Sequence, residues 1–256
     1  MCRIPEPDEE ENNPLAGLVV PRHIAVIMDG NGRWAEERGL PRLMGHVEGR
    51  QATRRVVEAC RDFKIEALSV YAFSIENWRR PLKEVQGLLE LIRTAMAEEL
   101  EDLQRNQVRV LVSGRLGELP DGLQGILEKA RRETAGNQGL TLNLLIDYGG
   151  RGEIVDAARG FAEEVQAGKA DPAQLNEETF AEYLYAPDLP DPDLLIRPGG
   201  EKRISNFLLW EAAYAELVFM DVLWPDFEKQ HLLEAIREFS RRQRRFGTVP
   251  QPDSPN

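Results

Sequence analysis

Cysteine and histidine are both scarce in this chain. Its 256 residues include two cysteines, Cys2 and Cys60, and three scattered histidines, His23, His46 and His231. Two distant cysteines make no disulfide framework, and the histidines have none of the spacings of a metal site. A disulfide-stabilised scaffold and a Cys/His metal centre are therefore excluded.

Positive charge and long apolar runs are lacking as well. The chain carries 32 Lys and Arg against 44 Asp and Glu, which gives a formal net charge of -12. This excess of acid disfavours nucleic-acid binding and attachment to an anionic membrane by charge alone. There is no secretory h-region and no stretch long enough to cross a bilayer. We therefore expect a cytoplasmic protein that does not bind nucleic acid.

Apolar, strand-like runs alternate with helical patterns along the chain. The strand-like runs lie near 24–28, 67–73, 108–113, 140–146, 194–196 and 217–219. Helical periodicity covers 50–63, 83–105, 122–134, 152–166, 177–185 and 228–246. This alternation predicts a single α/β domain of about six mainly parallel strands, flanked by helices on both faces. We expect the domain to span 21–247, between a flexible acidic tail at 1–20 and a short tail at 248–256.

The first strand-like run leads into a loop that combines an acid, two glycines and an arginine. Residues 23–34 read His-Ile-Ala-Val-Ile-Met-Asp-Gly-Asn-Gly-Arg-Trp. Ligands of parallel sheets bind beyond the carboxyl ends of strands, where Asp29 would stand. Gly30 and Gly32 would let backbone N–H groups close around an anion, and Arg33 would add a fork of donors. The loop is neither a Walker A motif nor a dinucleotide fingerprint, and it predicts a Mg²⁺–phosphate site.

Polar residues follow other strands too. Arg42 and His46 precede the next helix and either reach the same anion or are solvated surface residues; the sequence favours neither. Further polar groups follow the second, fourth and fifth strands, namely Asn77, Arg80, Arg151, Arg197, Arg203 and Ser205. Two arginines and a hydroxyl after the fifth strand predict a second anion site. Glu216, at the last strand, would be a second carboxylate for the metal.

The helix at 83–105 has an unusually broad apolar face. It is either a well-buried core helix or the wall of an apolar tunnel. Two anion sites, a metal site and an apolar wall together suit two diphosphates that carry apolar tails.

Four segments in this order resemble the cis-prenyltransferase family: His23–Trp34, Ser74–Pro81, Asp147–Arg151 and Arg197–Asn206. The resemblance covers about 21–247 and continues through Ala213–Leu217, Leu223–Phe227 and Arg244–Gly247. It implies the α/β fold with an apolar tunnel. It also implies Mg²⁺-dependent condensation of isopentenyl diphosphate onto an allylic diphosphate, such as farnesyl diphosphate, with a Z double bond formed in each cycle.

The resemblance assigns roles to individual residues. Asp29 would organise Mg²⁺ and assist departure of the diphosphate, Glu216 would be a further metal ligand, and Asn77 would take part in proton removal. The residues assigned to the allylic diphosphate are Gly30, Asn31, Gly32, Arg33, Arg42 and His46. Those assigned to the reacting centre are Ser74, Glu76, Asn77, Trp78 and Arg80. Those assigned to isopentenyl diphosphate are Arg197, Arg203 and Ser205. Three neighbours of these residues are also expected to bind substrate: Trp34, Ile75 and Ile204.

The family is dimeric, and Arg245 and Gly247 match its terminal motif. By resemblance they complete the neighbouring subunit's isopentenyl site; the alternative is a basic, solvated helix end. The product is expected to leave through transient contact with the inner face of a membrane.

Ala72 implies a long-chain product such as undecaprenyl diphosphate, the precursor of the cell-wall lipid carrier, because a bulky residue there tends to block the tunnel in the family. Two alternatives remain: a short- or medium-chain synthase, and a non-catalytic partner subunit of the same fold. The chain departs from the family pattern at Ile75, Asp147, Pro198 and Lys202, none of which removes a main anion donor.

Overall fold

The strand-like runs form one sheet in the computed structural model, which describes residues 14–242. The strands are β1 (His23–Val26), β2 (Ala67–Ser74), β3 (Arg109–Ser113), β4 (Thr141–Tyr148), β5 (Leu194–Arg197) and β6 (Glu216–Phe219). Their order is β3-β4-β2-β1-β5-β6, and every neighbouring pair is parallel. The predicted α/β class with a parallel sheet is confirmed.

Seven α-helices accompany the sheet within the described residues. They are α1 (Asn31–Glu37), α2 (Arg42–Asp62), α3 (Leu82–Arg105), α4 (Asp121–Thr134), α5 (Gly150–Gln166), α6 (Glu177–Ala181) and α7 (Lys229–Arg241). The sequence did not predict α1, and α2 begins earlier than expected because Gly45 and Gly49 interrupt its apolar period. The helix predicted at 177–185 ends at Ala181, where i to i+3 turns take over shortly before Pro187, which cannot continue a helix.

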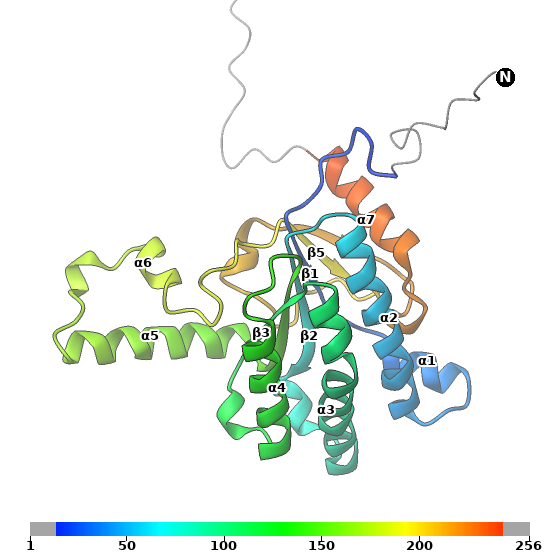
Figure 1. Cartoon of the computed structure of the whole chain (residues 1–256), viewed down its shortest axis with the longest axis horizontal. Helices are drawn as coiled ribbons and strands as arrows, with labels where there is room; N and C mark the ends of the chain where they lie inside the picture. Colours follow the sequence, from blue (N-terminus) through cyan, green and yellow to red (C-terminus); the bar gives the residue numbers. More distant parts are fainter. Residues whose placement is uncertain (1–13, 243–256) are drawn as a thin grey trace, which may run out of the picture.

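Both faces of the sheet are buried, which explains why the strands are mainly apolar. Alternate residues point to opposite faces. Ile24 and Val26 belong to the larger core, beneath α2, α3, α4 and α7, which lie along one face (Figure 1). Ala25 and Ile27 pack on the other face with Phe207 from the segment between β5 and β6.

Helix α5 begins at the carboxyl end of β4 and extends away from the sheet, with α6 beside it (Figure 1). Only the first half of α5 contributes fully buried residues, namely Gly150, Glu153 and Ala157. The rest of this arm is therefore held mainly by contacts between α5 and α6. No helix within residues 14–242 is long and apolar enough to cross a membrane.

The segment before β1 packs closer to the domain than its sequence suggested. Leu15, Leu18 and Val20 pack against the main core, and the Val19 N–H donates to Ser240 Oγ of α7 at 2.8 Å. Residues 14–20, which we had placed in the N-terminal tail, are part of the folded domain because their composition is apolar.

Candidate active site

The carboxyl ends of the neighbouring strands β1 and β5 lie at the point where the strand order of the sheet reverses. The chain leaves β1 toward β2 on one side, while β5 lies on the other side of β1. Open α/β sheets bind their ligands at such a switch point. Here Arg197 Nη2 donates to Asp29 Oδ2 at 2.8 Å, and Asp29 Oδ1 accepts the Gly30 N–H at 2.7 Å. Arg33 Nη2 lies 3.4 Å from the same oxygen.

Arg197 links the two expected anion sites. Its side chain is buried, and besides Asp29 it donates to Ser205 Oγ at 2.8 Å and to the Arg203 carbonyl. The Arg203 guanidinium itself pairs with Glu201 at the surface. Ser205 and Asn206 have left-handed backbones, with φ of 47° and 65°. Strained backbone of this kind is typical of functional sites.

The loop after β1 packs closely against α2. Gly30 caps α1 in the left-handed conformation with a φ of 100°. A Cβ at Gly45 or Gly49 would overlap atoms of Asn31, so both glycines allow the loop to approach α2. Sequence reasoning missed these two glycines. The available signal was their spacing of one helical turn, which places them on one helix face.

A polar pocket with a volume of about 90 Å³ lies at this loop. Its lining comprises Met28, Asp29, Gly30, Asn31, Gly32, Arg33, Arg42, His46 and Arg80. The structure therefore settles the position of Arg42 and His46, which line the same pocket as Asp29. Three arginines and one carboxylate, Asp29, line the pocket among the described residues, although Glu84 outside the lining lies 3.0 Å from Arg80 and 3.8 Å from Arg42. The first-turn N–H groups of α1 have no partner within their helix. The pocket is suited to an anion with several charges.

His46 provides independent support for an anion. Its Nε2 is buried and has no hydrogen-bond partner within the described residues, as is also true of Asn31 Oδ1. Burial, together with Arg80 and Arg42, lowers the pKa of His46 to about 4, although Glu84 acts in the opposite direction. His46 is therefore neutral near pH 7. A bound anion would offset the repulsion from the arginines and raise this pKa.

The metal ligands predicted from the sequence are not brought together within one chain. Glu216 is paired with Leu194 of β5, which is itself paired with Ile24 of β1, so it lies at the amino end of the strands. Its carboxylate binds Arg242 at 2.9 Å. Asp29 lies at the opposite edge, beyond the carboxyl end of β1. Within residues 14–242, no group of three or more His, Cys, Asp or Glu is arranged so that it could hold a metal ion.

A single carboxylate beside a polyanion pocket still fits Mg²⁺. This ion is usually held by one or two carboxylates, with substrate phosphates and waters completing its coordination. Asp29 would be the protein ligand, and a diphosphate would replace its carboxylate as the partner of Arg33 and Arg197.

The segment after β2 is organised by side-chain hydrogen bonds. Asn77 Oδ1 accepts the Ser74 N–H at 3.0 Å, which fixes the turn that carries Arg80 into the pocket. Trp78 Nε1 donates to Asp147 Oδ1 at 2.7 Å. Burial raises the pKa of Asp147. Sequence reasoning recognised Asp147 only as a departure from the family pattern, and the structure shows that it positions Trp78.

Asn206 connects this segment to the loop after β5. Its Nδ2 donates to Glu76 Oε1 at 3.0 Å, and its Oδ1 accepts the Arg151 N–H at 2.9 Å. Glu76 and Arg151 are thus held near the strained turn at Ser205.

Some predicted substrate-binding residues have other contacts. Trp34 Nε1 donates to Asp226 Oδ1 at 2.7 Å, and Ile204 packs against the core of the second sheet face. Ile75 lies against Gly149. Arg245 and Gly247 lie outside the described residues.

A larger, mainly apolar cavity of about 250 Å³ adjoins the polar pocket between α2, α3 and the sheet. The two share Met28, Asn31, His46 and Arg80. Ala72 lines the cavity, as do residues of α3 such as Leu88, Ile92 and Met96. Leu89 and Leu100 of α3 are buried in the core instead. One part of the broad α3 face is therefore core, and another part lines a cavity.

Residues 27–247 match the family model of undecaprenyl diphosphate synthases. The chain belongs to this family of cis-prenyltransferases. The isoprenyl transferase of Heliobacterium mobile is 50% identical over 230 residues, which are 90% of this chain and 88% of the relative. A Shewanella oneidensis ditrans,polycis-undecaprenyl-diphosphate synthase, described as specific for (2E,6E)-farnesyl diphosphate, is 50% identical over 228 residues, or 89% of this chain and 83% of that protein.

The fold agrees with these sequence matches. A crystal structure of lavandulyl diphosphate synthase from Lavandula x intermedia, in complex with dimethylallyl diphosphate, superposes with a TM-score of 0.87 at 33% identity. The superposition covers 90% of this chain and 99% of that one. The protein is therefore a prenyltransferase of isoprenoid biosynthesis, from an enzyme class that needs a metal ion.

Proposed function

We propose that this prenyltransferase condenses isopentenyl diphosphate repeatedly onto an allylic diphosphate, with farnesyl diphosphate as the primer. The product is a long-chain Z-polyprenyl diphosphate such as undecaprenyl diphosphate, the precursor of the cell-wall lipid carrier. The observation that carries the proposal is the polar pocket with three arginines and Asp29, which adjoins an apolar cavity. A diphosphate with a hydrocarbon tail matches this arrangement, because its charged head suits the polar pocket and its tail suits the apolar cavity.

The pocket residues would act mainly on the leaving group. Arg33, Arg42 and Arg80 neutralise the charge that develops on the allylic diphosphate as its C–O bond breaks. Mg²⁺, bound by Asp29 and the diphosphate, would supply further neutralisation of this charge. Because the arginines are placed before the reaction begins, little reorganisation is needed at the transition state.

The second diphosphate would bind at Arg197, Arg203 and Ser205. Arg197 contacts both Asp29 and Ser205, so the two substrates would be held next to each other and the alkene placed near the allylic carbon. The Asn77 amide is a poor base, and its oxygen already accepts a hydrogen bond from Ser74. We assign it a positioning role and propose the released diphosphate as the proton acceptor.

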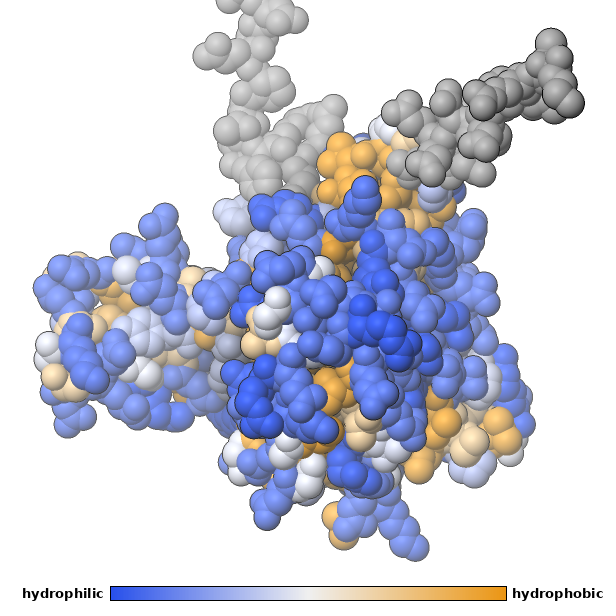
Figure 2. Space-filling model, viewed as in Figure 1, coloured by the Kyte–Doolittle hydropathy of each residue, from blue (hydrophilic) through white to orange (hydrophobic). Residues whose placement is uncertain are grey.

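Assembly and location belong to the same proposal. The enzyme would act as a cytoplasmic homodimer in which Arg245 and Gly247 complete the neighbouring isopentenyl site. Glu216 would serve as a metal ligand only across a subunit interface, since it lies far from Asp29 in its own chain. Exposed Leu40, Met44 and Val47 support transient membrane contact, and apolar atoms gather beside α1 in Figure 2.

The decisive measurement is the length of the products. With farnesyl diphosphate, labelled isopentenyl diphosphate and Mg²⁺, the purified protein is expected to release chains many isoprene units longer than the primer. Products that stop after one or a few additions would instead identify a short- or medium-chain synthase. A homodimer that turns over only after a second chain is added would identify a non-catalytic partner subunit. Intact Asp29 and Arg33 in the pocket argue against this last alternative.

Diphosphate binding is expected to be coupled to protonation of His46. Its pKa of about 4 should rise when an anion joins Arg42 and Arg80, so binding takes up a proton and strengthens as the pH falls toward that value. Calorimetric titration with farnesyl diphosphate in buffers of different ionisation enthalpy measures this uptake. His46→Gln should abolish it, and uptake that is unchanged in this variant would contradict the assignment.

A further inference from the structure

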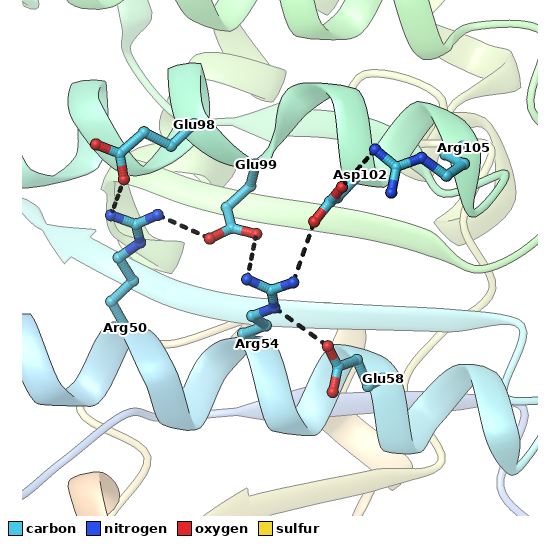
Figure 3. Close-up of polar contacts among 7 residues, drawn as sticks. All are labelled: Arg50, Arg54, Glu58, Glu98, Glu99, Asp102 and Arg105. Carbon is cyan, nitrogen blue, oxygen red and sulfur yellow. Dashed lines mark hydrogen bonds and ion pairs between the residues drawn. The ribbon is translucent and has the colours of Figure 1, made fainter.

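Five charged residues connect α2 and α3 across their solvent side. We call them the α2–α3 seam: Arg50 and Arg54 of α2 with Glu98, Glu99 and Asp102 of α3 (Figure 3). Arg50 lies 2.5 Å from Glu98 and 2.7 Å from Glu99. Arg54 lies 3.0 Å from Asp102 and 3.7 Å from Glu99. Arg50 thus bridges two adjacent carboxylates of the facing helix, and Arg54 bridges two carboxylates one turn apart.

The seam borders the apolar cavity. Four of its members, Arg50, Arg54, Glu99 and Asp102, line that cavity, whereas Glu98 is exposed on the outside. Most of the other lining residues are apolar or small, including Thr53 and Val57 of α2, Ile92, Ala95 and Met96 of α3, and Val70, Leu142 and Leu144 of the sheet. Polar groups also line it, at the polar pocket (Asn31, His46, Asn77 and Arg80) and elsewhere (Glu58, Arg61 and Asn106). The sheet thus forms the floor of the cavity, the helices form its walls, and the ion pairs span the gap between the two helices.

This closure is weaker than an apolar helix–helix contact. The outer pairs include the half-exposed side chains of Glu98 (56%) and Arg54 (47%), and such pairs contribute little individually and are screened by salt. The Arg50–Glu99 pair is more sheltered, with side chains 20% and 22% exposed. Each helix is also anchored independently, α3 by α4 and α2 by α1, α7 and the Trp224 segment. The seam can therefore open while the domain stays folded.

The cavity is small for a long hydrocarbon. Its volume of about 250 Å³ is below the range of roughly 300–1,000 Å³ typical of ligand sites. A chain of many isoprene units must therefore part α2 and α3 or stop growing.

We propose that the α2–α3 seam is a lateral closure that limits product length in this enzyme. The proposal rests on the chain-elongation activity proposed above. As the tail fills the cavity, the ion pairs resist its passage between the helices, and release competes with further addition. A weakened seam lets the tail emerge sideways, so that elongation continues.

Binding of n-alkyl diphosphates of increasing length tests the seam without turnover. For the native protein, affinity should rise about fourfold per buried methylene and then level off when the cavity is full. In the double variant Glu98→Gln/Asp102→Asn, the rise should continue to longer chains. Glu66→Gln is the matched control, because it removes a surface arginine–glutamate pair with Arg22 outside the cavity. The affinity of this control should level off at the same chain length as that of the native protein.

Product analysis provides the second readout. The seam variant should release longer chains than the native enzyme and the Glu66→Gln control. Added salt should lengthen the native products but leave those of the seam variant unchanged. Identical plateaus for native and variant proteins in the binding series would overturn the proposal. Absence of polyprenyl products from the native enzyme would instead refute the elongation activity, while the binding series would still report on the seam.

Discussion

Asp29→Ala is expected to lower turnover by roughly 10²- to 10³-fold, the range found when one preorganised group that stabilises transition-state charge is removed. Among the described residues that line the polar pocket, Asp29 is the one carboxylate, and its oxygens order the Gly30 N–H, Arg33 and Arg197. The variant loses both the proposed metal ligand and the group that aligns the two anion sites. Steady-state kinetics with labelled isopentenyl diphosphate measure the loss. Near-normal kinetics would exclude the assigned role.

A matched substitution separates charge from hydrogen bonding. Asp29→Asn keeps an oxygen that can accept from the Gly30 N–H or Arg197 but removes the negative charge. Asp29→Ala leaves the buried Arg197 guanidinium without its carboxylate, which destabilises the fold. We expect the asparagine variant to unfold closer to the native temperature while its turnover stays low. Recovery of activity by asparagine would show that the charge is dispensable.

Glu211→Gln is expected to stabilise the protein at alkaline pH. Glu211 is partly buried beside the fully buried Glu153, and its buried Oε2 has no hydrogen-bond partner in the part of the chain that the structure describes. Tyr148 Oη and the Tyr185 N–H both donate to Glu153, so this carboxyl is the better satisfied of the two. Burial and the neighbouring Glu153 raise the pKa of Glu211 to about 8.

The sign of the pH dependence follows from this raised pKa. Between the unfolded pKa, near 4.5, and about 8, the folded protein keeps a proton that the unfolded chain has lost. The contribution of Glu211 to stability is therefore full below pH 4.5 and declines as the pH rises through about 8. The decline is about 1.4 kcal/mol per pH unit for one group. Glutamine carries no titrating proton and removes this slope.

Urea unfolding at about pH 5, 6.5 and 8 checks this expectation. These values span the pH range in which the free energy of unfolding should decline by roughly 1.4 kcal/mol per pH unit. The free energy of unfolding of the native protein should fall more steeply with pH than that of Glu211→Gln. Glu163→Gln, on an exposed position of α5, is the control and should follow the native slope. Parallel slopes for the native protein and Glu211→Gln would show that Glu211 titrates normally.

Local sequence determined the sheet and the chemistry of the first loop. Strands that are buried on both faces are mainly apolar, so runs such as 194–196 are visible without a structure. The acid, glycines and arginine of residues 29–33 follow β1 directly, and the carboxyl end of a parallel strand is where ligands bind. The role of residues 29–33 therefore follows from the strand that immediately precedes them in the sequence.

Tertiary structure decided everything that depends on groups far apart in the chain. The Asp29–Arg197 contact, the entry of His46 into the pocket and the Glu153–Glu211 pair all join different elements. Strand register also separates Glu216 from Asp29, although both are acids at strand ends. A sequence displays which side chains each element carries. Only packing determines which of them meet, how far they are buried and therefore what charge they keep.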